Sequence, residues 1–406
     1  MNRTVLYVLL ALVAGVAWLA AQRLEDTFYI PLDDPAIQYS QRAARDPVAR
    51  LQQRVEKGEV KLEAASNGLG YLPAVLQQLD VNPDSQALVF SKTSTQAERI
   101  GPRTPRAIYF NDDVTVGFVR DSDVLEIASL DPQQGVQFYV LVKVAEPAFA
   151  ESQGCLRCHQ GAATLGIPGL LISSVHPVSS TRQEHGNAFM TDQRTPLSGR
   201  WGGWYVTGTT GPQTHLGNNT NLVDPVRSGG PSAQPTQNLT SLGDMFDTSR
   251  YLAPTSDIVA LMTLEQQTRM TNLMIRIGWD GRRGVPTDQL NPEIEELLKY
   301  MLFLDEEPLR SPVKGVSTFT ETFSRRGPRD SQGRSLRDFE LKTRLFRYPL
   351  SYMIYSAAFD GLPDQVRVRI YQRLYERLSS DSSETAKAIL DIVRATKAGL
   401  PDYWRL

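Results

Sequence analysis

Both cysteines of this 406-residue chain lie in one short segment, Gly154-Cys155-Leu156-Arg157-Cys158-His159, in which a histidine follows the second cysteine. If the segment forms a helical turn, residues three and four positions apart share a face, so both sulfurs and the imidazole point the same way. Covalent haem c requires that arrangement, because two thiols bond the vinyl groups of the porphyrin and an imidazole binds the iron. We therefore predict one covalent haem c, with Cys155 and Cys158 as its anchors and His159 as the proximal ligand.

The same residues admit two other kinds of site. A Cys-x-x-Cys pair with two later histidines can form a tetrahedral zinc site, and the pair alone can be a dithiol redox centre or a disulfide. Neither alternative requires a histidine directly after the second cysteine. Because the chain has only two cysteines and four histidines, the full motif favours haem c and leaves zinc and a dithiol open.

The ligand on the other side of the iron decides what such a haem does. His215 is the first candidate, because it lies in a glycine-rich loop where backbone can pass close to a planar cofactor. His185, His176 and then Met190 follow. Two strong ligands close the iron to small molecules and leave electron transfer. We therefore expect His215→Ala, and not His176→Ala, to convert the haem spectrum to high spin.

Three aromatic residues are candidates for the wall of the haem pocket. Haem is a large apolar disc with two carboxylates, and Trp201, Trp204 and Tyr205 lie together in one segment bordered by glycines. The alternative is that these side chains pack the core of a sheet. An open sixth position on the iron would instead allow peroxide or diatomic gas chemistry, which needs a distal donor such as Arg200, Tyr205 or His185.

The N-terminus indicates export. Residues 1–21 combine a basic start at Arg3 with an uncharged run from Val5 to Ala21, which is typical of a cleaved signal peptide or a membrane anchor. Leu19 stands where a signal cleavage site prefers a small residue, so an anchor is slightly favoured. The body of the chain is then on the periplasmic side, anchored or secreted, which agrees with haem c attachment outside the cytoplasm.

Composition and patterning predict an α+β protein. The chain is 41% hydrophobic and 22% charged with a net charge of −2, which fits folded domains and gives no sign of nucleic-acid binding. We expect a helical tether at 22–84, an antiparallel β-rich haem c-binding domain at 85–250 and a helical domain at 251–406. Within 85–250 the short β-rich runs are 87–91, 107–110, 114–119, 124–128, 136–142, 169–175 and 201–208.

Helical periodicity marks both ends of the chain. Near the N-terminus it covers 47–56 and 70–79, and after Pro254 it covers 256–276, 292–304, 340–359, 363–378 and 384–397. Ser256 is the expected cap of the first helix in the second group. The stripe of Met262, Met270 and Met274 on that helix is expected to pack in the core rather than bind iron.

The motif makes the chain resemble c-type cytochromes with a single attachment site. Over residues 85–400 it looks like the large single-haem cytochrome c domain proteins of environmental bacteria, a family without an assigned reaction. The landmarks are Arg103-Thr-Pro-Arg-Ala107, Trp201-Gly-Gly-Trp-Tyr-Val-Thr-Gly208, Ser256-Asp-Ile-Val-Ala260 and Leu345-Phe-Arg-Tyr-Pro349. This resemblance implies haem and export, but no substrate. Strands that lead into the motif also resemble PAS-like haem c sensor domains, although the helical tail shows no kinase or methyl-accepting pattern.

The length of the chain indicates more than a simple carrier. An ordinary soluble cytochrome c needs about 100 residues around its haem. We predict an exported mono-haem electron-transfer protein, a membrane-tethered subunit of a larger redox assembly that meets a redox partner protein. Electron transfer is favoured over catalysis, and the alternatives are a peroxidase-like enzyme with an open sixth site and a haem sensor.

Overall fold

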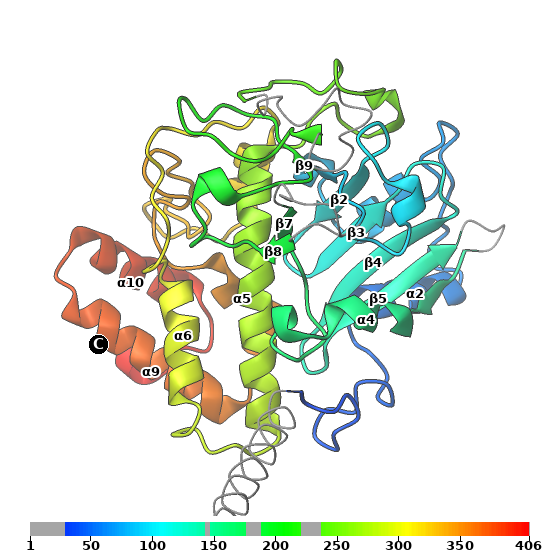
Figure 1. Cartoon of the computed structure of the whole chain (residues 1–406). Helices are drawn as coiled ribbons and strands as arrows, with labels where there is room; N and C mark the ends of the chain where they lie inside the picture. Colours follow the sequence, from blue (N-terminus) through cyan, green and yellow to red (C-terminus); the bar gives the residue numbers. More distant parts are fainter. Residues whose placement is uncertain (1–28, 143–146, 176–187, 221–236, 406) are drawn as a thin grey trace, which may run out of the picture.

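The computed structural model describes residues 29–142, 147–175, 188–220 and 237–405 (Figure 1). The segment at 1–21 that is predicted to be a signal peptide or anchor lies outside these residues. Within the described part of the chain, no helix is both long and apolar enough to span a membrane.

An antiparallel sheet and a mainly helical C-terminal half make up the fold, so the predicted α+β class is confirmed. In the described residues the sheet has seven strands in the order β6-β5-β4-β3-β2-β1-β9. A separate hairpin joins β7 and β8. The strands are β1 Ala87–Val89, β2 Arg106–Phe110, β3 Val114–Phe118, β4 Val124–Asp131, β5 Gly135–Val142, β6 Phe149–Glu151, β7 Ser173–Val175, β8 Ala188–Met190 and β9 Trp204–Tyr205.

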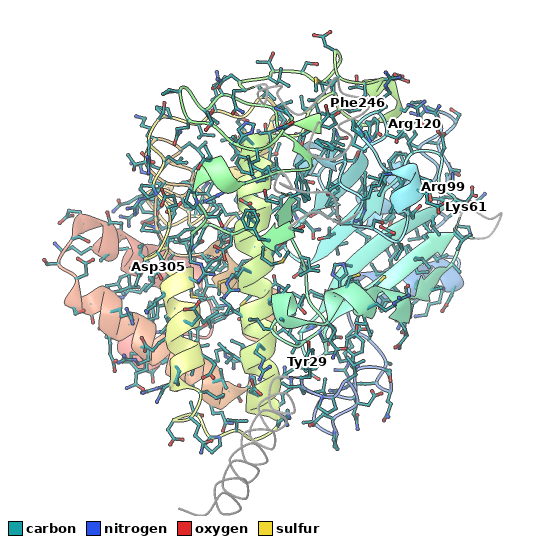
Figure 2. All side chains as sticks on the ribbon, in the orientation of Figure 1. Tyr29, Lys61, Arg99, Arg120, Phe246 and Asp305 are labelled. Atoms are coloured by element: carbon teal, nitrogen blue, oxygen red, sulfur yellow. The ribbon has the colours of Figure 1, made fainter. Side chains whose placement is uncertain are left out.

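The two faces of the sheet pack against different elements, because side chains alternate along each strand. One face, with Tyr109 and Val116, packs on helices α2 (Pro47–Glu56) and α3 (Leu72–Gln78). The region predicted as a helical tether therefore covers one side of the sheet. The opposite face turns toward α5 (Ile258–Arg282), and side chains from both halves pack against one another over part of this interface (Figure 2).

Helix α5 is the central element of the C-terminal half. It carries Met262, Met270 and Met274, all buried, which confirms that the methionine stripe belongs to the core. Around it lie α6 (Asn291–Met301), α7 (Phe319–Arg325), α8 (Ala357–Asp360), α9 (Asp364–Ser380) and α10 (Glu384–Thr396). The helices predicted at 256–276, 292–304, 363–378 and 384–397 correspond to α5, α6, α9 and α10. One hydrophobic core joins residues of the sheet to these helices.

Three of the predicted elements differ from the structure. The helix expected at 340–359 is wrong: the Glu340 carboxylate accepts hydrogen bonds from the N–H groups of Lys342, Thr343 and Arg344 and so forms a turn, and only a 3₁₀ turn at Tyr352–Tyr355 and α8 are helical. The strands expected at 169–175 and 201–208 shrink to β7 and β9. In the second, Trp201 and Gly203 adopt positive φ angles of 67° and 85°, which a strand does not allow.

The cap of α5 is Asp257 rather than the predicted Ser256. The Asp257 carboxylate accepts hydrogen bonds from Val259 N at 2.8 Å, at the start of the helix, and from Val316 N and Ser317 N at 2.8 Å in a later loop. Ser256 instead receives a hydrogen bond from Leu88 N on β1. One buried carboxylate thus joins the central helix to a loop about 60 residues further along the chain.

We expect Asp257→Ala to lower the free energy of unfolding by about 3 kcal/mol. The change removes a helix cap and leaves the partly buried N–H groups of Val316 and Ser317 without their acceptor. Urea unfolding followed by circular dichroism measures the effect. Ser383→Ala is the control, because exposed Ser383 caps α10 by accepting one hydrogen bond from Ala386 N. Its loss should cost about 1 kcal/mol. Equal losses of unfolding free energy in the two variants would mean that the contacts of Asp257 to the 316–317 loop add no stability.

Candidate haem-attachment site

The Cys-x-x-Cys-His segment forms a helical turn directly after the sheet. A 3₁₀ turn at Gln153–Cys155 continues into the short helix α4 (Leu156–His159). The turn is fixed to the sheet by a hydrogen bond of 2.8 Å from Ser152 N to the carbonyl of Phe138 on β5. Cys155 is partly buried, Cys158 is exposed, and both are free thiols.

A hydrogen bond holds one ring nitrogen of His159 and fixes the tautomer of the ring. Its Nδ1 lies 2.8 Å from the carbonyl oxygen of Gly169. A carbonyl oxygen only accepts, so Nδ1 carries the proton and Nε2 keeps a lone pair. Burial lowers the pKa of His159, which favours the neutral ring that binds a metal. A carbonyl that accepts a hydrogen bond from one ring nitrogen in this way fixes the tautomer and orientation of a histidine that binds a metal.

Helix α5 fixes the segment that orients His159. Asn272 Oδ1 accepts a hydrogen bond of 2.9 Å from Leu170 N, and its Nδ2 donates one of 2.8 Å to the Leu170 carbonyl. A side chain on Gly169 would not fit, since a Cβ there would lie 2.5 Å from Asn272 Oδ1. The long buried helix thereby determines where the Gly169 carbonyl and the imidazole stand.

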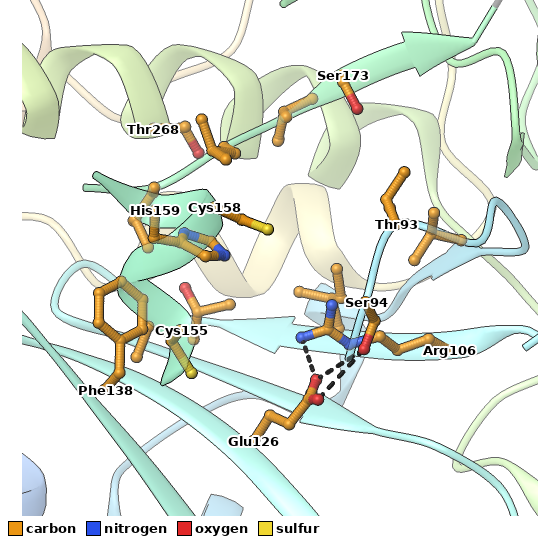
Figure 3. A pocket seen from close by; sticks show the side chains of 18 of the residues that line it. Thr93, Ser94, Arg106, Glu126, Phe138, Cys155, Cys158, His159, Ser173 and Thr268 are labelled. Carbon is orange, nitrogen blue, oxygen red and sulfur yellow. Dashed lines mark hydrogen bonds and ion pairs between the residues drawn. The ribbon is translucent and has the colours of Figure 1, made fainter. Parts of the chain in front are cut away.

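A large cavity opens between the motif, the sheet and α5 (Figure 3). The centres of water-sized molecules can occupy about 190 Å³ of this cavity, and its mouth opens to solvent. In the close-up the imidazole of His159 turns toward this space. Apolar residues dominate the lining, with a hydroxyl-rich loop on one side; the lining includes Cys155, Cys158, His159, Phe138, Ile108, Leu170, Leu171, Ile172, Met190, Trp204, Leu264, Thr93, Ser94, Thr95 and Thr268.

Of the three aromatic residues predicted to bind the cofactor, Trp204 lines the cavity. Its Nε1 donates a hydrogen bond of 2.8 Å to the carbonyl of Ser173 on β7. Tyr205, the next residue of β9, points to the other face of the sheet, where its hydroxyl bonds the Pro102 carbonyl. Trp201 is fully buried against the ring of His215, with 5.6 Å between ring centroids, and does not line the cavity.

The candidates for the sixth iron ligand are placed differently from one another. His215 is buried away from the cavity lining, and burial lowers its pKa to about 4. His176 and His185 lie outside the described residues. Met190 lines the cavity at the end of β8, with 41% of its surface exposed. Among the described candidates, the structure brings Met190 to the cavity that holds the motif.

The distal donors named from the sequence lie elsewhere. Arg200 forms a buried ion pair with Glu265 on α5, with 3.1 Å between Nη1 and Oε2, and neither Arg200 nor Tyr205 lines the cavity. The cavity instead contains a second ion pair, Arg106 with Glu126, which sequence reasoning missed. The available signal was Glu126 inside the β-rich run 124–128 and Arg106 directly before the run 107–110. In the described residues, no group of three or more His, Cys, Asp or Glu side chains could hold a metal ion.

A scan against protein-family models and searches of curated proteins and of solved structures found no match to this chain.

Proposed function

We propose that the protein is a mono-haem c-type cytochrome that transfers electrons. One observation carries the proposal: both thiols of the motif and the free Nε2 of His159 lie on one helical turn and line the same largely apolar cavity. Haem c needs thiols for its vinyl groups, a nitrogen for its iron and an apolar space for its ring. Cys155, Cys158 and His159 would hold the group, and Trp204 and Phe138 would form part of its pocket wall.

The chemistry that the bound haem supplies is reversible one-electron transfer. The protein orients the imidazole through Gly169 and Asn272 and keeps the ring in apolar surroundings. Exposed Cys158 places the attachment edge near the surface, where a redox partner protein has access. Export to the periplasmic side, a membrane anchor at 1–21 and membership of a larger redox assembly complete the proposal, on the grounds of the sequence.

For the sixth ligand we propose Met190 in preference to His215, because Met190 lines the cavity and His215 is packed against Trp201. A thioether ligand gives a higher reduction potential than a second histidine does. The peroxidase-like alternative requires that this position be open.

A visible spectrum tests the proposal directly. The full chain is produced in a host that attaches haem c, and the oxidised and reduced forms are recorded. We expect a covalent, six-coordinate, low-spin haem. A colourless protein, or one that holds zinc through the two thiolates, would overturn the proposal. A five-coordinate iron that binds carbon monoxide in the wild type would favour the peroxidase-like alternative.

We expect Met190→Ala to convert the iron to high spin and to let it bind carbon monoxide, because the variant removes the sulfur ligand. His215→Ala should leave the low-spin spectrum unchanged. Magnetic circular dichroism of the oxidised protein distinguishes methionine from histidine ligation. High spin in His215→Ala alone would restore His215 as the ligand, and a low-spin spectrum in both variants would move the assignment to His176 or His185.

A further inference from the structure

An ion pair stands on the sheet wall of the cavity. Arg106 Nη2 lies 2.7 Å from Glu126 Oε2, and both side chains are largely buried. Figure 3 shows the pair across the cavity from His159, on strands β2 and β4. Among the described residues that line this cavity, these two carry the formal charges. Burying a charge pair in an apolar wall costs desolvation free energy. Its presence here therefore points to a structural or binding role.

The sheet is built to accommodate this pair. Strand β3 lies between β2 and β4, and its Gly117 is the register partner of both Ile108 and Glu126. A Cβ on Gly117 would lie 2.6 Å from Arg106 Nη2 and 2.8 Å from Nε. The missing side chain leaves room for the guanidinium to cross β3 and reach the carboxylate on the next strand.

Glu126 and Arg106 differ in how fully their hydrogen-bonding groups are used. Glu126 Oε1 accepts from Thr95 Oγ1 at 2.9 Å and from Ser94 Oγ at 3.2 Å, besides the ion pair. Although burial opposes it, Arg106 and these hydroxyls lower the pKa of Glu126, so the carboxylate stays charged. In the described residues the ion pair uses Nη2 of Arg106, and neither its Nη1 nor its buried Nε has a hydrogen-bond partner. The guanidinium therefore has donors left for a second acceptor.

We propose that Arg106 binds a propionate carboxylate of the haem, with Glu126 as the positioning residue that holds the guanidinium in place. The inference rests on the proposed function, because it requires haem in this cavity. Haem carries two carboxylates, and Arg106 is the cation that the described lining offers them. An arginine fork suits a carboxylate, since its N–H groups form parallel, charge-assisted hydrogen bonds. The guanidinium then bridges two carboxylates, one from the protein and one from the cofactor.

The test compares the purified holoprotein with Arg106→Gln, Arg106→Lys and Glu126→Gln variants. Arg250→Gln is the control, because Arg250 pairs with Asp121 at 2.9 Å on the surface, outside the cavity. Covalent haem content is measured first, and the reduction potential is then titrated from about pH 5 to pH 9. Infrared difference spectra with haem labelled at its propionate carbons separate those carboxylates from Glu126.

In the wild type, Arg106 keeps the propionate ionised, so the potential should vary little with pH. Arg106→Gln should retain its haem, because the thioether bonds remain. The haem propionate that has lost Arg106 should become protonated as the pH falls. The infrared band of the labelled propionate should then change from that of a carboxylate to that of a carboxylic acid. Because the unpaired carboxylate stabilises ferric iron, the ferrous-to-ferric ratio at a fixed applied potential should fall about tenfold between low and high pH, which corresponds to a differential interaction of about 1.4 kcal/mol.

Arg106→Lys should recover part of the wild-type behaviour. Glu126→Gln, which keeps the cation, should raise the ferrous-to-ferric ratio without adding a pH dependence, and Arg250→Gln should match the wild type. A wild-type propionate band and a flat pH profile in Arg106→Gln would overturn the inference. Altered carbon monoxide binding with an unchanged propionate band would place Arg106 beside the iron instead, which also overturns it. A wild-type protein without covalent haem would refute the proposed function before any variant is compared.

Discussion

Replacing both Cys155 and Cys158 with alanine should abolish covalent haem, so that no haem stays with the chain after acid denaturation. The two thiols are the only cysteines of the chain, and both line the cavity. Each single alanine variant should keep one thioether and therefore retain haem with a shifted spectrum of the reduced form. Haem staining of denaturing gels and intact-protein mass measure the outcome.

The matched control is Ser152→Ala, which removes the hydroxyl 3.4 Å from Cys155 Sγ and leaves both thiols in place. It should retain one covalent haem per chain. His159→Gly adds a separate test of the iron, because imidazole in the buffer should fill the space of the lost ring and restore the low-spin spectrum. If the double cysteine variant kept covalent haem, or if the wild type itself carried no haem, the attachment role would be wrong.

The elements that the sequence predicts well are those in which the spacing of apolar residues matches the faces that the element buries. The five β-rich runs before the motif alternate between two packed faces, and α9 and α10 carry regular apolar stripes, whereas α5 is buried on nearly all sides. The helix expected at 340–359 was wrong because apolar periodicity does not report side-chain contacts to the backbone. The Glu340 carboxylate accepts hydrogen bonds from nearby backbone N–H groups and so stabilises a turn in place of a helix.

The centre of the site was predictable because its chemistry is local in sequence. Cys155, Cys158 and His159 need only one helical turn to share a cavity. The surrounding groups depend on register and tertiary contacts instead. Arg106 and Glu126 meet across an intervening strand at Gly117, and Asn272 reaches the motif segment from a helix about 100 residues away. The difference between Trp204 and Tyr205 is one of strand register, since neighbouring residues face opposite sides of β9.

We expect the buried ion pair of Arg200, in the loop behind Met190, to contribute strongly to stability. Arg200 donates through Nη1 to Glu265 Oε2 at 3.1 Å, through Nε to the Thr195 carbonyl at 2.7 Å and through Nη2 to the Gln193 carbonyl at 3.0 Å. Glu265 is fully buried on α5. We expect Arg200→Met to cost about 3–5 kcal/mol of unfolding free energy, because it leaves the Glu265 charge in the core without a partner.

The pH dependence of this loss has a defined sign. Burial raises the pKa of Glu265 and Arg200 opposes that rise, so removing Arg200 raises the folded-state pKa further above its value in the unfolded chain. A raised carboxyl pKa contributes stability that is present at low pH and lost as pH increases. Urea unfolding of Arg200→Met should therefore show a smaller deficit, relative to wild type, near pH 5 than near pH 8.

Two further variants separate the buried charge from the loss of a side chain. The double variant Arg200→Met, Glu265→Leu should recover most of the stability at pH 8, because no charge remains in the core. Arg194→Met is the matched control: Arg194 pairs with Asp192 at 2.7 Å, but about a third of its side chain is exposed, so its loss should cost about 1 kcal/mol or less. A deficit that is independent of pH and unchanged in the double variant would mean that Arg200 acts through its two carbonyl contacts alone. In that case the hydrogen bonds to Thr195 and Gln193, rather than the charge on Glu265, would be what fixes the loop behind β8.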